Sequence, residues 1–108
     1  MQESVNRLGA LADEFRELEA RLADPDTTSD LDLLRTVSRR YRELEPIVAA
    51  QQALGARQGD LAVARELLEH ATVDERPHLE DEVDEALGEI ERLEGELREL
   101  LLPRDPHA

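Results

Sequence analysis

The sequence has no cysteine, no tryptophan and no lysine, and its only aromatic side chains of the Phe, Tyr or Trp type are Phe15 and Tyr41. Without cysteine, disulfide bridges and thiolate metal sites are excluded. With two aromatics, a core must consist of Leu, Val, Ile and Ala. No apolar run approaches the roughly 20 residues that a membrane-spanning helix needs. Because a polar stretch follows Met1, we also expect no signal peptide and a cytoplasmic location.

The chain is strongly acidic, with 27 Asp and Glu residues against 13 arginines and a net charge of −14 over 108 residues. Tight nucleic-acid binding depends on neutralising phosphates with basic side chains. Strong autonomous binding of RNA or DNA is therefore not expected. The abundance of Glu, Leu, Arg and Ala is typical of long helices.

Apolar residues recur at helical spacing in three segments, which predict helices over about 5–22, 30–69 and 74–102. The apolar positions are Val5, Leu8, Leu11, Phe15, Leu18 and Leu22; then Leu34, Val37, Tyr41, Leu44, Ile47, Val48, Leu54, Leu61 and Leu68; then Leu79, Val83, Ala86, Ile90, Leu93, Leu97 and Leu100. Short connections favour antiparallel neighbours. The predicted fold is all-α: an elongated antiparallel three-helix bundle or coiled-coil-like arm.

The second predicted helix contains residues that disfavour helix. Pro46 removes one backbone hydrogen bond and predicts a kink. Gly55 and Gly59 each weaken a helix by roughly 1 kcal/mol relative to Ala. This helix is therefore predicted to be kinked at residue 46 or broken near 55–60.

Two connections carry turn and capping chemistry. In 24–30, Asp30 or Ser29 can cap the second helix. Acids in 24–35 follow the spacing of a calcium loop, but Ser29 and Arg35 occupy the positions that require glycine and glutamate, so a helix-joining turn is favoured. Thr72 and Glu75 match a capping box before the third helix.

Catalytic and metal-binding patterns were not found. The histidines at 70, 78 and 107 lie beside no plausible ligand set, and the many carboxylates fall on polar helix faces. A carboxylate acid–base pair would need one member in a desolvated pocket. We therefore predict no enzyme activity, no cofactor and no metal.

One local group of residues is basic although the chain as a whole is acidic. Arg35, Arg39 and Arg42 are spaced i, i+4, i+7 and form a stripe on one helix face, with Arg40 nearby. The stripe is a candidate partner-binding site for a phosphate or an acidic protein. The alternative is ion pairing with glutamates of a packed neighbouring helix, each pair contributing little.

Three stretches, "VSRRYRELEPIV" (37–48), "DLAVARELL" (60–68) and "LLLPRDP" (100–106), resemble the N-terminal domain of a bacterial class I peptide chain release factor, the paralogue that reads UAA and UAG. They occur in the order and at the spacing of that family. The resemblance implies that residues 1–102 are the helical N-terminal domain. It also implies that 103–108 begin a linker to a codon-reading and Gly-Gly-Gln body that is absent here, since no Gly-Gly pair occurs in the chain.

The resemblance implies a role in translation termination that positions the factor and carries no catalysis. Its implied partners are the ribosome, at the stalk base of the large subunit, together with the GTPase release factor and the glutamine methyltransferase of the family. An alternative is a freestanding acidic adaptor or coiled-coil chaperone that dimerises through its apolar seam. No membrane partner is expected.

Overall fold

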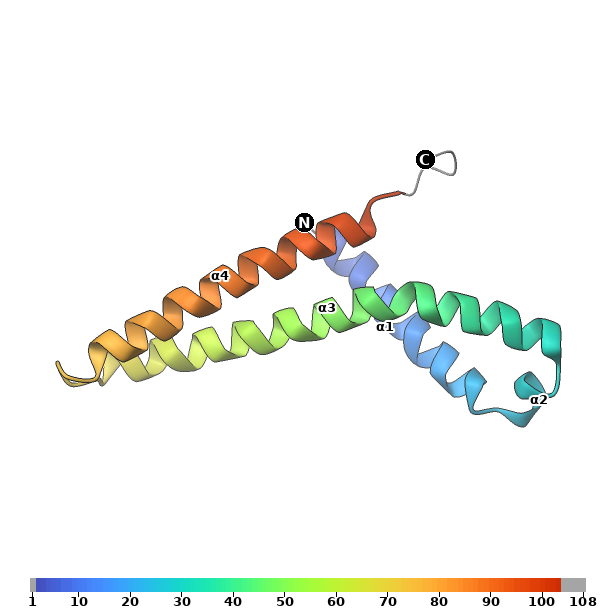
Figure 1. Ribbon diagram of the computed structural model, residues 1–108, viewed down its shortest axis with the longest axis horizontal. Helices are drawn as coiled ribbons and strands as arrows, with labels where there is room; N and C mark the ends of the chain where they lie inside the picture. Colours follow the sequence, from blue (N-terminus) through green and yellow to red (C-terminus); the bar gives the residue numbers. More distant parts are fainter. Residues whose placement is uncertain (1, 104–108) are drawn as a thin grey trace. The chain divides into compact units, whose positions relative to one another are not determined.

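A computed structural model describes residues 2–103 of the chain, and within them the only regular secondary structure is helix. The helices are α1 (Gln2–Leu22), α2 (Pro25–Thr28), α3 (Leu31–Glu69) and α4 (Arg76–Leu101) (Figure 1). The predicted all-α fold with three long helices is confirmed. The single turn α2 is an addition, because the sequence indicated only a non-helical turn there.

The chain divides into two compact units, and α3 contributes to both. Unit 1 is Met1–Ala49 and contains α1, α2 and the first part of α3. Unit 2 is Ala50–Ala108 and contains the rest of α3 and α4. Each unit contains one antiparallel pair of long helical segments, with the short α2 in addition in unit 1.

In unit 1, α1 lies antiparallel to the first part of α3. Phe15 stacks on Tyr41 with ring centroids 4.6 Å apart and an interplanar angle of 17°. Next to these residues in the sequence, Glu14 pairs with Arg40. The buried apolar side chains of this unit are Leu18, Val37, Leu44, Ile47 and Val48. Every one belongs to the predicted apolar stripes.

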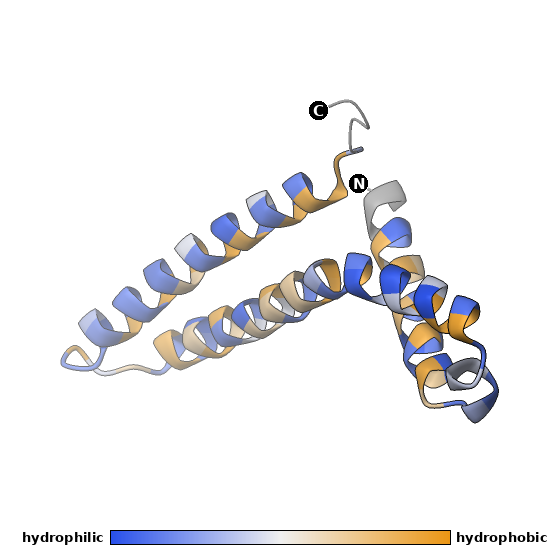
Figure 2. Cartoon of the chain, turned by 45° about the vertical axis from the view of Figure 1, so that its right-hand side comes forward, coloured by the Kyte–Doolittle hydropathy of each residue, from blue (hydrophilic) through white to orange (hydrophobic). Residues whose placement is uncertain are grey.

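In unit 2, the second part of α3 and α4 run side by side in opposite directions (Figure 1). The buried apolar residues are Ala50, Ala64, Leu79, Ala86, Leu93 and Leu97. In Figure 2 the hydrophobic residues of α4, coloured orange, follow one side of the helix, and the hydrophilic residues, coloured blue, follow the other. Between residues 72 and 101 the sequence has twelve acids and three arginines, so the hydrophilic side carries a large negative charge.

Side-chain caps fix where the helices begin. The Asp24 carboxylate accepts a hydrogen bond from the Asp26 amide, at 3.0 Å, and caps α2. Asp30 accepts from the Leu33 amide at the start of α3, at 3.2 Å. Before α4, the Thr72 amide donates to Glu75 at 2.9 Å and the Glu75 amide donates to the Thr72 hydroxyl at 3.3 Å. These reciprocal bonds confirm the predicted capping box.

Helix α3 is continuous from Leu31 to Glu69, so the predicted alternative of a break near 55–60 is wrong. Gly55 and Gly59 do not have positive φ angles and are ordinary helical residues. A glycine lowers helix propensity but forms every backbone hydrogen bond, and the helix on both sides is long enough to carry the cost. Pro46 lies inside α3, and the kink expected at this residue stays a prediction.

Helix α4 ends two residues before the described part of the chain does. Leu100 and Leu101 are half-buried, while Leu102 lies beyond the helix with 58% of its surface exposed. Residues 104–108, including Pro106 and most of the expected linker, lie outside the described residues. Within the described part, none of the helices combines the length and apolar character needed to cross a membrane.

Candidate functional site

A groove of about 560 Å³ lies on the surface of unit 1, and the predicted arginine stripe forms its polar part. The groove is lined by Leu22, Leu34, Arg35, Ser38, Arg39, Tyr41 and Arg42. One residue comes from the end of α1 and the others from the first three turns of α3. The helical spacing i, i+4, i+7 therefore places the three guanidinium groups along a single recess.

Arg40 is the neighbour of the stripe and behaves differently from it. Its Nε donates to Glu14 Oε2 at 2.6 Å and its second terminal nitrogen donates to Glu14 Oε1 at 2.9 Å. Its remaining terminal nitrogen lies 3.2 Å from Glu43 Oε2. Arg40 thus makes a bidentate contact across the helix pair, which is the pairing that the sequence suggested for the stripe as a whole.

The Glu14–Arg40 contact changes the acidity of both groups. The hydrogen bonds from the Arg40 guanidinium lower the pKa of Glu14 below its ordinary value of 4.5, because they favour the ionised carboxylate. The same contact raises the pKa of Arg40. The two side chains remain 38% and 42% exposed, so solvent screens their attraction.

We expect Glu14→Gln to lower the free energy of unfolding by about 0.5 kcal/mol at pH 7. The folded-state pKa of Glu14 is depressed, so the stabilisation is complete above about pH 4.5 and is lost as pH falls through the lowered pKa. Urea unfolding of the parent and the variant at pH 7 and pH 3 measures the difference, which should be smaller at the lower pH. Glu17→Gln is the matched control, because the Glu17 carboxylate is exposed and forms no ion pair among the described residues. A difference that persists unchanged at pH 3 contradicts the assignment.

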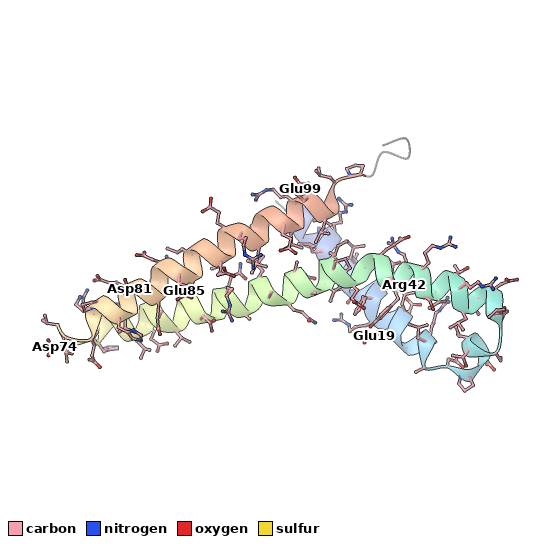
Figure 3. All side chains as sticks on the ribbon, in the orientation of Figure 1. Glu19, Arg42, Asp74, Asp81, Glu85 and Glu99 are labelled. Atoms are coloured by element: carbon pink, nitrogen blue, oxygen red, sulfur yellow. The ribbon has the colours of Figure 1, made fainter. Side chains whose placement is uncertain are left out.

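The three stripe arginines are exposed and, among the described residues, no carboxylate lies within ion-pairing distance of any of them. Arg42 Nε donates to the Ser38 carbonyl at 3.3 Å, which leaves its terminal nitrogens available. Figure 3 labels Arg42 on the unit 1 part of α3. It also labels the acid Glu19 on α1 of the same unit, and Asp74, Asp81, Glu85 and Glu99 in unit 2. The residues that line the groove include three arginines and no acid, so the lining is positively charged although the chain is acidic.

The rest of the groove surface is apolar. Leu22 and Leu34 are half-buried and line it from α1 and α3. Tyr41 is held by its stacking on Phe15 and also faces the groove, so it serves both the core, as predicted, and the surface. An apolar surface beside three guanidinium groups can bind a partner through burial and charge together.

Within the described part of the chain, polar side chains also come together at two exposed places in unit 2. His78 Nε2 lies 3.2 Å from Glu82 Oε1 one turn along α4, with both side chains exposed. A shallow surface recess in unit 2 contains Arg57, Asp60, Glu82, Glu85 and Glu89, with Val63, Ala64 and Ala86. Among the described residues, no cluster of three His, Asp or Glu side chains is arranged to hold a metal ion. His107 lies outside them.

Taken together, the fold and the groove define an acidic all-α domain with a local cationic recess on one helix face. The chain belongs to the PCRF domain family, whose model matches residues 11–108. It is 42% identical over 107 residues to peptide chain release factor 1 of Mycolicibacterium gilvum (strain PYR-GCK). The alignment covers 99% of this chain and 29% of the relative, so the chain spans less than a third of that protein's length. No solved structure matches the chain significantly.

These comparisons confirm the resemblance to a class I release factor. They do not favour the alternative of a freestanding adaptor or chaperone, because the family match extends over almost the whole chain. The roles of Arg35, Arg39 and Arg42 are outside what the comparisons test.

Proposed function

We propose that this chain is the N-terminal helical domain of a class I peptide chain release factor for UAA and UAG, acting in translation termination in the cytoplasm. The observation that carries the proposal is the 42% identity to a release factor along 99% of the chain. In this proposal residues 1–102 form the domain and 103–108 begin the linker to the rest of the factor. The domain positions the factor on the ribosome and contacts partners.

The proposed role includes no catalysis by this chain. The sequence holds no Gly-Gly pair, so the Gly-Gly-Gln loop that the family resemblance implies must lie in another part of the factor. The described acids also sit mostly on exposed helix faces, where water solvates their carboxylates. A general acid requires a desolvated carboxyl group instead.

The proposed contacts are with the stalk base of the large ribosomal subunit, and with the GTPase release factor and the glutamine methyltransferase of the family. The net charge of −14 supports protein surfaces over bare RNA as the main partners, because like charge repels the phosphate backbone.

The 108-residue chain should release no peptide from ribosomes stalled at a stop codon. A release factor that lacks only this domain should retain codon-dependent peptide release. If the domain supplies binding that is equal in the ground and transition states, its deletion raises KM for the ribosome, on the order of tenfold, with kcat within about twofold. Single-turnover release assays at UAA, UAG and a sense codon measure both quantities.

Release by the isolated chain would mean that the hydrolytic groups lie within it. A folded truncated factor with no remaining release activity would show that the domain does more than position. The sense-codon reaction is the control for non-specific hydrolysis of peptidyl-tRNA.

A further inference from the structure

We infer that the groove formed by Arg35, Arg39 and Arg42 binds an acidic, leucine-containing peptide segment of a partner protein. The inference specifies what kind of partner the domain contacts in its proposed positioning role. It rests on the proposed function only for the setting in which this binding takes place. Binding to the chain itself can be measured without ribosomes. Failure of one proposal is therefore distinguishable from failure of the other.

The charge of the groove favours carboxylates. The Arg40 guanidinium is paired with Glu14 and Glu43, whereas the three groove arginines make no ion pair among the described residues. Arginine presents its donors in a planar fork that matches a carboxylate with two parallel hydrogen bonds. A partner with acids one helical turn apart can engage arginines that are themselves one turn apart.

The apolar lining makes the site more than a charged patch. Leu22, Leu34 and Tyr41 face the same recess, and the volume of about 560 Å³ is large enough for a few side chains of a partner. Removing apolar surface from water at this position contributes favourable free energy that a purely charged ligand cannot provide. An amphipathic helix with leucines on one side and glutamates beside them supplies both contacts.

A nucleic acid fits these observations less well. Residues 1–49 contain eleven acids and seven arginines, so unit 1 carries a net charge of −4 around its groove. Affinity for a phosphate backbone grows with the number of phosphates that basic side chains neutralise. Three arginines in an acidic surface offer few such contacts, and a phosphate backbone leaves the leucine lining unused.

The test uses fluorescence anisotropy of the 108-residue chain with a labelled 14-residue peptide that has leucine at helical i, i+3, i+4, i+7 spacing and glutamate elsewhere. Saturable binding is expected. The combined variant Arg35→Gln, Arg39→Gln and Arg42→Gln should raise Kd about 30-fold, because three charge-assisted hydrogen-bonding groups are lost. All three side chains are exposed, so circular dichroism should show unchanged helix content.

The matched control is Arg7→Gln, Arg65→Gln and Arg98→Gln, which removes the same charge from exposed arginines outside the groove. Kd should change less than about threefold, since none of these three arginines lines the groove. Two further peptides separate the contributions of the ligand: glutamine in place of glutamate, and serine in place of leucine. Each should bind at least about tenfold more weakly than the parent peptide.

Four results overturn the inference. They are no saturable binding up to about 1 mM peptide, equal losses in the two arginine variants, undiminished binding of the glutamine peptide, and undiminished binding of the serine peptide. A labelled 12-nucleotide RNA that binds more tightly than the peptide, and is lost with the groove variant, would assign the groove to phosphate instead.

Discussion

Leu44→Ala should lower the free energy of unfolding by about 3 kcal/mol, the largest effect expected of a single substitution in this chain. Leu44 is the largest fully buried side chain, with 2% of its surface exposed. Truncation removes three carbons from the core of unit 1 and leaves a cavity that the surrounding helices fill incompletely. The aromatic side chains Phe15 and Tyr41 stack on each other, so neither can move to fill this cavity.

Leu67→Ala is the matched control, because it deletes the same atoms from the same helix. Leu67 is 51% exposed, so its truncation should cost less than about 0.5 kcal/mol. Urea unfolding followed by circular dichroism at 222 nm measures both variants. If the two units unfold in separate transitions, only that of unit 1 should shift for Leu44→Ala. Similar losses at the two positions would mean that Leu44 is not buried in solution.

The positions of the helices could be predicted because apolar periodicity records which side of a helix is covered. Each predicted stripe residue whose side chain is described is buried or half-buried, from Leu8 in α1 to Leu100 in α4. Val5 also belonged to a stripe, but its side chain lies outside the described set. Caps were predictable for the same local reason: Thr72 and Glu75 form their bonds within one turn.

The partition of the arginines could not be predicted. Arg39 and Arg40 are neighbours in sequence but point about 100° apart around the helix. Periodicity gives that angle, yet it does not say which face lies beside the carboxylates of α1. The structure places Glu14 against Arg40 at 2.6 Å and leaves Arg39 in the groove. The sequence spacing therefore indicates that the three arginines share a helix face, while their surroundings depend on the packing of a second helix.

The sequence alone also could not predict that α3 is continuous, because local helix propensity and long-range packing oppose each other in this segment. Gly55 and Gly59 favour an interruption, whereas the half-buried Leu54 and Leu61 on either side favour one helix packed on α4. Packing prevails in the structure, where one helix extends to Glu69.

Gly55→Ala with Gly59→Ala should raise the free energy of unfolding by about 1.5 kcal/mol, since each change gains up to roughly 1 kcal/mol of helix propensity. Apart from its chain neighbours and the nearby backbone of the same helix, a Cβ atom at either position meets no atom within 4 Å, and neither glycine has a positive φ. Gln58→Ala is the control, because it changes an exposed residue between them that already favours helix, and its effect should be within about 0.5 kcal/mol.

The sign of the double-alanine effect separates two structures of this segment. In a continuous helix, alanine restricts the unfolded chain and fits the folded one, so stability rises. In a helix that ends near residue 55 with a glycine in the left-handed conformation, a Cβ atom is strained and stability falls. Thermal unfolding at equal protein concentration measures the change in Tm. A lower Tm for the double variant would therefore contradict the continuous α3, and with it the helical register that carries Leu61 and Ala64 onto α4.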